Sequence, residues 1–504
     1  MRLKTFVHRS IQWGTAAALT LGVAVPGAFA SSAPGPTAFA HPGSYIPAET
    51  PAAATALPGQ NKVKNHVGSK KEILGPTDPS YNMDIFYDKN NHTITGSMSV
   101  TFKNNLDKTL NHVYFNLWDN AGVFTSNGGG ITVSNVKVNG ETATFDVNGV
   151  HLDISDLSLP KNRPVTVQMD FNISIPNQMD RFGWYNTTVS LGNWFPILAV
   201  YDDEGWNLDP YYPYGEAFYS LTSQFDVTVT TDKDEVIATT GREIGQPEIH
   251  DGLATHHYKA HQVRDFALEM STDYMVKSAQ VKNVDVNVYY TEAQAKYADS
   301  LLEAGKRSIR LFSEKFGKYA WPKLDIASMK GWFGGMEYPQ LVMISIVGNP
   351  SQAWAKSVTA HEIGHQWFYG MVGDNEYDEP WLDESFAAFS AALFDGTLDQ
   401  LNTAPPDEPY YHLSSSVSDF TAHASEGGIG AYYNTIYGYG SRTLNDLREL
   451  LGDEAFYDSI HQYFKKEKFE VSSTAEFIHI MEQASGQDLS EFFKNHRVYV
   501  SDQK

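Results

Sequence analysis

Two histidines and two glutamates stand at a spacing that could hold a metal ion and activate water on it. His361 and His365 are four residues apart. In a helix this puts their imidazoles about 40° apart around the axis and roughly 6 Å apart along it, so both can reach one ion. Glu362 lies beside the pair, where its carboxylate can hold a metal-bound water and take its proton. Glu384 follows after eighteen intervening residues, at the start of a second helix-prone run.

Two imidazoles and one carboxylate leave a zinc ion a fourth position for water. The simplest alternative is an amphipathic core helix whose histidines make ordinary hydrogen bonds. A third ligand at a fixed spacing on its own helix, flanked by Trp367 and Trp381, favours the metal site. We therefore predict one Zn²⁺ ion per chain, held by His361, His365 and Glu384.

The stretch from His361 to Glu384 resembles the gluzincin signature of the M1 family of zinc metallopeptidases, which is His-Glu-x-x-His, eighteen residues, and then glutamate within Trp-Leu-x-Glu. Residues 192–198 and 263–267 are also similar to the amino-terminal domain of bacterial members. The resemblance implies an all-β amino-terminal domain of sandwich or saddle form. A thermolysin-like mixed α/β catalytic domain, largely helical, should follow it, and the implied activity is hydrolysis of the first peptide bond of peptides.

A second motif just before an apolar run consists of Gly334, Gly335, Met336 and Glu337. It resembles the family's Gly-x-Met-Glu-Asn exopeptidase motif. Glycines let backbone approach a ligand closely, so this edge could pair with an extended peptide while Glu337 meets the free α-ammonium. The alternative is a glycine turn with a solvated glutamate. Tyr338 replaces the usual asparagine, which leaves the side-chain preference of the enzyme open.

Tyr437 stands before a helix-prone run and resembles the tyrosine of the family's Tyr-x-Lys-Gly helix start. The resemblance implies that its hydroxyl donates a hydrogen bond to the oxyanion of the tetrahedral intermediate. It also implies, more loosely, that Tyr432 lines the substrate site. Either tyrosine could instead be a half-buried core aromatic. Tyr439 replaces the lysine of the pattern.

Many family members carry an acid seven residues after the third ligand, where it supports a zinc histidine. Here that position is Ala391. Either another carboxylate orients the histidines, with Asp383 as a nearby candidate, or zinc is held less firmly. The acidic run at residues 374–379 could suggest a calcium loop, but it lacks the calcium-loop spacing, so a solvated loop is the favoured interpretation.

The composition indicates a soluble protein of at least two domains, since single cores stop growing well before 504 residues. The chain has 37 basic and 60 acidic residues and a net charge of −23, a surface that repels nucleic acid and anionic membranes. There are no cysteines, which excludes disulfides and a thiol nucleophile.

Residues 1–30 have the cationic start, short apolar run and small-residue end of an export signal. We predict cleavage after Ala30 and a secreted protein without stable membrane insertion; an uncleaved leader that anchors the protein is the alternative. Residues 31–71 are rich in Pro, Ala, Gly and Ser and are predicted to be flexible. Residues 72–276 are predicted to be the β-domain, and residues 277–504 the zinc domain, with no helical-repeat domain after it.

Alternating apolar residues predict strands at 93–102, 113–118, 165–175 and 225–230, and a helical pattern covers 292–316.

These observations predict a secreted, zinc-dependent aminopeptidase that acts on peptides with a free amino terminus. An endopeptidase or an epoxide hydrolase using the same site is one alternative, and Glu337 argues against the endopeptidase. The other alternative is a catalytically silent, secreted peptide-binding protein. The presence of Glu362 and of all three predicted ligands argues against it. No residue pattern indicates an oligomeric state.

Overall fold

The computed structural model describes residues 73–500 apart from gaps at 107, 213, 217, 407–409 and 424–427. The predicted leader and the predicted flexible segment lie outside the described residues. Among the helices of the described ranges, none combines the length and the apolar character needed to cross a membrane.

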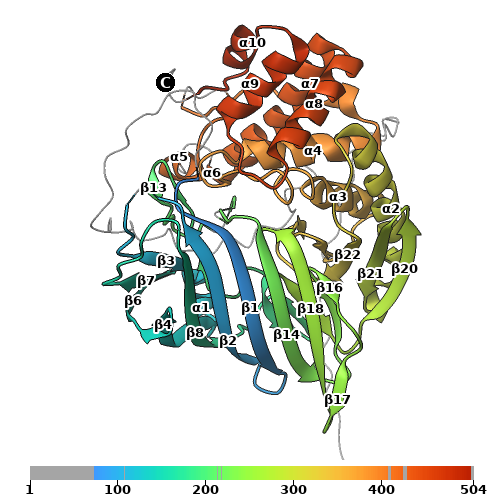
Figure 1. Ribbon diagram of the computed structural model, residues 1–504. Coiled ribbons are helices and arrows are strands. Elements are labelled where there is room, and N and C mark those ends of the chain that lie inside the picture. Colours follow the sequence, from blue (N-terminus) through green and yellow to red (C-terminus); the bar gives the residue numbers. More distant parts are fainter. Residues whose placement is uncertain are drawn as a thin grey trace, which may run out of the picture. The chain divides into compact units, whose positions relative to one another are not determined.

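The first half of the described chain is built from β-sheets, and the largest of them contains β1, β2, β8, β14 and β18 side by side (Figure 1). Along β1 the side chains of Tyr81, Met83 and Ile85 are buried and those between them are exposed, because successive residues of a strand point to opposite faces. β1 pairs with β14 in parallel and with β2 antiparallel. In spatial order the strands are β16 (Arg242–Glu243), β18 (Leu253–Val263), β14 (Ser223–Asp232), β1 (Pro76–Asp88), β2 (Thr93–Asn104), β8 (Pro164–Ser174), β4 (Gly130–Val138) and β5 (Glu141–Thr142), with β17 (Glu248–His250) beside β18.

Smaller sheets accompany the large one. Asn139 and Gly140 close the hairpin between β4 and β5 with φ values of 53° and 88°, as an Asn-Gly turn requires. One four-stranded sheet, which later bears on the site, contains β15 (Val236–Thr239), β19 (Leu268–Ser271), β10 (Thr188–Leu191) and β9 (Phe182–Tyr185). The remaining elements of this half are β11 (Ile197–Leu198), β3 (Val113–Asn116), β7 (His151–Ser155), β6 (Thr144–Asn148), β12 (Tyr201–Asp202), β13 (Gly205–Trp206), η2 (Trp118–Asn120) and α1 (Gly122–Thr125).

The second half begins with a mixed five-stranded sheet and continues in helices. In spatial order its strands are β20 (Met275–Val281), β21 (Val284–Tyr290), β22 (Lys323–Met329), β24 (Leu341–Ser345) and the antiparallel edge strand β23 (Gly335–Met336). The helices are η3 (Glu292–Tyr297), α2 (Ala298–Lys315), α3 (Gln352–Gly364), α4 (Trp381–Asp395), η4 (Leu398–Gln400), α5 (Val417–Ala422), α6 (Gly428–Tyr432), η6 (Tyr433–Tyr439), α7 (Gly440–Leu451), α8 (Asp453–Glu467), α9 (Thr474–Ser485) and α10 (Ser490–Asn495). Figure 1 shows α7, α8, α9 and α10 gathered together in red.

The predicted fold class is confirmed, because β-sheets come first and a mixed, largely helical part follows. The strands predicted at 93–102 and 165–175 correspond to β2 and β8, and the helix predicted at 292–316 corresponds to η3 and α2. The predicted boundary after residue 276 falls inside β20, which pairs with β21 of the second half. The domain limits therefore stay a prediction.

The two helices that carry the predicted zinc ligands cross at a glycine. Ser351 starts α3 by accepting a hydrogen bond from the Trp354 amide. At the other end, a Cβ placed on Gly364 would lie 2.9 Å from Cβ of Ser390 and 3.2 Å from Cα of Ala387, both on α4. Since atoms of a packed core do not approach that closely, the missing side chain of Gly364 sets how near the helices can come.

Gly364→Ala should therefore force α3 and α4 apart. We expect a loss of about 1–3 kcal/mol in the free energy of unfolding and a weaker affinity for zinc, because overpacking shifts backbone. Chemical denaturation and a competitive zinc titration would measure the two effects. Gly430→Ala is the matched control, since Gly430 is exposed in α6 with open space around it. Unchanged stability and zinc affinity in Gly364→Ala would show that this glycine does not set the helix spacing.

Candidate zinc site

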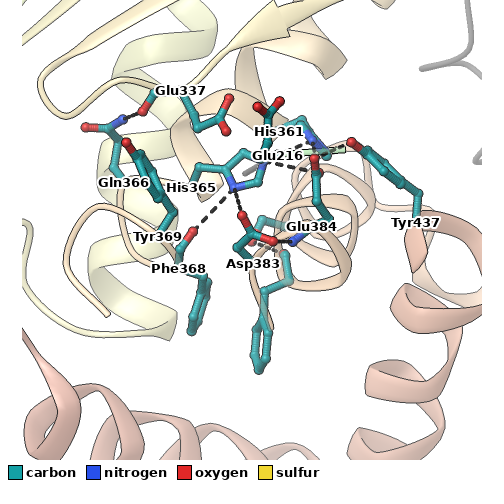
Figure 2. Close-up of polar contacts among 12 residues, drawn as sticks. Glu216, Glu337, His361, His365, Gln366, Phe368, Tyr369, Asp383, Glu384 and Tyr437 are labelled. Atoms are coloured by element: carbon teal, nitrogen blue, oxygen red, sulfur yellow. Dashed lines mark hydrogen bonds and ion pairs between the residues drawn. The ribbon is translucent and has the colours of Figure 1, made fainter. Parts of the chain in front are cut away.

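The three predicted ligands come together at one point (Figure 2). Nε2 of His361 lies 3.2 Å from Nε2 of His365, and Oε2 of Glu384 lies 3.2 Å and 3.3 Å from these two atoms. The three residues are 4%, 1% and 4% exposed. A tetrahedral ion about 2.0–2.1 Å from its ligands separates them by about 3.3 Å. The triangle of donor atoms therefore fits zinc.

The two helices supply these ligands from facing ends. His361 is in the last turn of α3, His365 is its C-cap residue, and Glu384 is in the first turn of α4. Burial lowers the pKa of His361, which favours the neutral imidazole that binds metal. Burial also opposes a charge on His365, yet Glu337 and Glu384 raise its pKa to about 10, so zinc must displace a proton there. Burial works against ionisation of Glu384 too, but the two histidines outweigh it and lower the pKa of this carboxyl.

His365 is oriented from behind by a carbonyl and a carboxylate (Figure 2). Its Nδ1 lies 3.3 Å from the carbonyl oxygen of Phe368 and 3.9 Å from Oδ2 of Asp383. Since the Phe368 carbonyl can only accept, Nδ1 carries the hydrogen and Nε2 is left for the metal. Ala391, at the position where many members of the M1 family have an acid, is buried at 2% exposed. Asp383 is thus the carboxylate that lies near Nδ1 of His365, on the side away from the predicted metal position.

Glu362 and Glu337 lie beside His365 in the same space. One carboxyl oxygen of each and one ring nitrogen of His365 lie within 4.8 Å of one another. Gly335 approaches Glu362 so closely that a Cβ on it would lie 2.4 Å from Oε1. Burial, reinforced by neighbouring carboxylates, raises the pKa of Glu362 well above its usual range and that of Glu337 to about 8.

The remaining residues of the predicted exopeptidase motif form and precede the edge strand β23. The carbonyl of Gly334 accepts a hydrogen bond from the amide of Ser345 at 2.9 Å. Met336 pairs with Met343 of β24, and its side chain is only 2% exposed. The side chain of Met336 therefore belongs to the core, so only the backbone of this residue could contact a ligand at the strand edge.

The structure brings Tyr437 to the predicted zinc ligands. Its hydroxyl donates a hydrogen bond to the carboxylate of Glu384, and its ring stacks on His361 with centroids 5.7 Å apart (Figure 2). Tyr437 is in the π-helix η6, a conformation often found at functional sites. Tyr432 packs behind it at 6.1 Å between ring centroids and is 0% exposed.

A comparison with known families matches residues 300–496 to the peptidase family M1 domain. The match contains every site residue predicted above. Residues 300–496 are a peptidase family M1 domain.

Curated relatives of this M1 domain extend the similarity to most of the chain. Aminopeptidase N of Lactococcus lactis subsp. lactis is 24% identical over 457 residues, which are 82% of this chain and 50% of that protein. Probable aminopeptidase 2 of Sulfurisphaera tokodaii is 26% identical over 235 residues, which are 42% of this chain and 30% of that protein. The chain spans half of the length of the first relative and less of the second.

Solved structures share the fold at low sequence identity. An M1 zinc metallopeptidase from Deinococcus radiodurans aligns with a TM-score of 0.59 and 18% identity over 85% of this chain and 95% of that one. Legionella pneumophila aminopeptidase A, solved in complex with aspartic acid, aligns with a TM-score of 0.64 and 17% identity over 85% of this chain and 51% of that one. These similarities show that the β-sheets and the M1 domain together form a known arrangement.

Glu216 and Arg181 join the M1 site from the first half of the chain, and the sequence analysis missed both. The Arg181 guanidinium donates a hydrogen bond to the Glu216 carboxylate, and these side chains are 8% and 11% exposed. Burial raises the pKa of Glu216 even though Arg181 opposes the shift, and the charges of Glu384 and His365 also act on it. Glu216 lies in the loop between β13 and β14, at no fixed spacing from the zinc motif, so only the tertiary structure reveals it.

The interpretation of residues 374–379 as a solvated loop was wrong. Asp374, Asn375 and Glu376 are 6%, 0% and 2% exposed. The physical reason is Arg264, whose buried positive charge lies near Asp374 and Glu376 while its guanidinium donates to backbone carbonyls. A distant arginine in the sequence thus makes an acidic segment part of the core of the M1 domain.

Asp383→Asn should weaken zinc binding roughly tenfold or more, because supporting carboxylates behind a zinc histidine typically contribute that much to affinity. The amide has the same shape but lacks the charge that favours His365 bound to a dication. A competitive zinc titration at constant pH would measure the dissociation constant. Asp395→Asn is the control, since Asp395 ends the same helix and accepts its hydrogen bond from Ser357, away from the ligands. Equal zinc affinity in wild type and Asp383→Asn would contradict a supporting role.

Proposed function

We propose that this protein is a zinc-dependent aminopeptidase that hydrolyses the first peptide bond of peptides. The observation that carries the proposal is the position of Glu337, whose carboxyl lies within 4.8 Å of groups of His365 and Glu362. A carboxylate held there can bind an α-ammonium by a charge-assisted hydrogen bond, which fixes the distance between the amino terminus and the hydrolytic centre. The relatives named as aminopeptidases support the same activity.

His361, His365 and Glu384 would hold one Zn²⁺ ion. When bound, zinc polarises the scissile carbonyl and makes water acidic enough to attack it near neutral pH. The charge of the site favours this ion, since the buried carboxyl of Glu337 and the half-buried carboxyl of Glu216 add to that of Glu384. Buried acids are stable when they are paired with cations, and a dication together with a substrate ammonium meets that requirement.

The chain's own groups then move the protons and bind the developing charge. Glu362 takes the proton of the attacking water on its carboxylate and returns it to the leaving amine. Burial favours the protonated form of this carboxyl, and the charge of a bound zinc ion would favour the ionised form that accepts the proton. Tyr437 donates its hydroxyl hydrogen to the oxyanion, and its present contact with Glu384 places that hydroxyl at the edge of the ligand triangle.

The substrate binds as an extended strand along β23, with the backbone of Gly335 and Met336 as its partner. Gly334 and Gly335 leave room for this approach. The α-ammonium then lies between Glu337 and Glu216, which come from opposite halves of the chain. Peptides with a free amino terminus are therefore the proposed substrates.

We also propose that the protein is secreted after removal of residues 1–30. The support is the three-part pattern of the leader. Fractionation of expressing cells, with mass determination of the mature amino terminus, would distinguish cleavage after Ala30 from an uncleaved membrane anchor.

Glu362→Gln should keep its zinc and lose turnover by on the order of a thousandfold or more, because the change removes the base without removing a ligand. Steady-state kinetics on an amino-acid amide and metal analysis of the same sample would show both. Glu303→Gln on the exposed side of α2 is a control for loss of a carboxylate in general. Substantial activity in Glu362→Gln would remove this residue from the role of base.

A peptide with a free amino terminus should be hydrolysed roughly 10- to 100-fold faster than its acetylated form, since one charge-assisted hydrogen bond is lost on acetylation. Glu337→Gln should lower kcat/KM for the free peptide by a similar factor and leave the acetylated peptide unaffected. Equal rates on both peptides in the wild type would favour an endopeptidase. Peptide binding without zinc or turnover would favour a silent binding protein.

A further inference from the structure

The segment that carries Glu337 is held at both ends by the first half of the chain. This segment, residues 332–338, connects β22 to β24 and contains the edge strand β23. Its partners come from the ends of β9, β10 and β19, which are neighbours in one four-stranded sheet. The contacts at the two ends are different in kind.

The start of the segment is held by an acid and an arginine. Nε1 of Trp332 donates a hydrogen bond to Oδ2 of Asp180 at 2.9 Å. The guanidinium carbon of Arg181 lies 5.5 Å from the ring centroid of Phe333, while the same side chain pairs with Glu216. The turn before β9 thus contacts both the segment of residues 332–338 and the carboxylate of Glu216.

The end of the segment is held by a buried relay of hydrogen bonds. The hydroxyl of Tyr338 donates to Oδ1 of Asn193 at 2.6 Å, and Nδ2 of Asn193 donates to the carboxylate of Asp265. The amide of Phe266 donates to the other oxygen of Asp265 at 2.6 Å. Tyr338, Asn193 and Asp265 are 0%, 2% and 1% exposed. The relay therefore ends on fixed backbone and excludes water.

The length of the Tyr338 side chain brings its hydroxyl to this relay. A Cβ placed on Gly192 would lie 1.9 Å from the Tyr338 hydroxyl, so the ring occupies the space that a side chain at Gly192 would fill. The asparagine that the family usually has at this position is too short to reach Asn193 along the same line. Tyr338 stands where the family usually has asparagine. Gly192 leaves room for its ring, and Asn193 accepts the hydrogen bond of its hydroxyl.

Glu337 is also fixed from the zinc side. Nε2 of Gln366, the residue after His365, donates to the carbonyl oxygens of Glu337 and Tyr338 at 2.9 Å and 3.1 Å. The backbone of Glu337 is therefore held between the helix of the zinc ligands and the relay from β10. A shift of either side would move its carboxylate relative to the ligand triangle.

We propose that Tyr338 and Asn193 are positioning residues for amino-terminal recognition, holding Glu337 where it meets the substrate's α-ammonium. The proposal rests on the aminopeptidase function proposed above. Loss of the Tyr338 hydroxyl removes the hydrogen bond to Asn193 Oδ1 in the core, so Gln366 alone holds this end of the segment. Since productive contacts tolerate displacements of only a fraction of an ångström, ammonium binding should weaken while zinc and its ligands stay in place.

The test compares two zinc-binding probes that differ only in the α-amino group, leucine hydroxamate and 4-methylpentanohydroxamic acid. Calorimetric titration of each into the zinc-loaded, full-length protein gives the preference for the amino compound without requiring turnover. We expect the wild type to prefer leucine hydroxamate, and Tyr338→Phe and Asn193→Ala each to lose roughly fivefold or more of that preference. The double variant should lose no more than the stronger single variant, because both changes break one relay.

Tyr297→Phe is the matched control. Tyr297 is equally buried, at 1% exposed, and its hydroxyl donates to the carbonyl of Pro350 at 2.7 Å, away from the site. It should lose stability but keep the full preference. A zinc-loaded Tyr338→Phe variant that also keeps the full preference would overturn the positioning role. If Asn193→Ala does not fold, the result for Tyr338→Phe decides the test by itself. A wild type without any preference would instead contradict the proposed aminopeptidase function.

Discussion

The close crossing of α3 and α4 is the constraint on which the rest of the site depends. A helix presents His361 and His365 on one side, but a third ligand must come from another element at the right height. Gly364, Ala387 and Ser390 are small enough for the helix backbones to approach, and the carboxylate of Glu384 then comes within 3.3 Å of both imidazoles. With larger residues at this crossing, the same two motifs would stand too far apart to share one ion.

The second constraint is charge. Glu384 is ionised against the two histidines, while burial raises the pKa of Glu337, Glu362 and Glu216, so each added negative charge makes the next one less favourable. Such a cluster is stable in a protein interior only with cations nearby. Arg181 supplies one from the chain itself, and the proposed zinc ion and substrate ammonium supply the others. Catalytic competence and the electrostatic stability of this core are therefore linked.

The sequence predicts what is local in the chain and misses what the tertiary structure assembles. His361, His365 and Glu384 follow from helical periodicity and a short spacing, and β2 and β8 follow from alternation along single strands. Glu216 could not be found this way, because nothing in its loop encodes a distance to the zinc motif. Residues 374–379 looked solvated for the same reason, since their partner Arg264 lies over a hundred residues earlier. Secondary-structure propensity and hydrophobic pattern describe the preferences of a segment by itself. Whether an acidic segment can be buried depends on a cation that can lie far away in the sequence.

The β-sheets and the predicted zinc domain are separate along the sequence, but residues of both contribute to the candidate site. All three proposed ligands and the proposed base lie within residues 361–384, and the proposed oxyanion donor Tyr437 lies beside them in η6, so the groups proposed for hydrolysis all come from the second half of the chain. The proposed recognition of an amino terminus also needs residues of the first half of the chain. Asn193 holds Glu337 in position through Tyr338, and Glu216 itself lies in the first half. A hydrolytic centre cuts wherever a carbonyl reaches it, while an exopeptidase must also measure the distance to a chain end. In the proposed aminopeptidase, contacts between the two halves of the chain set that distance.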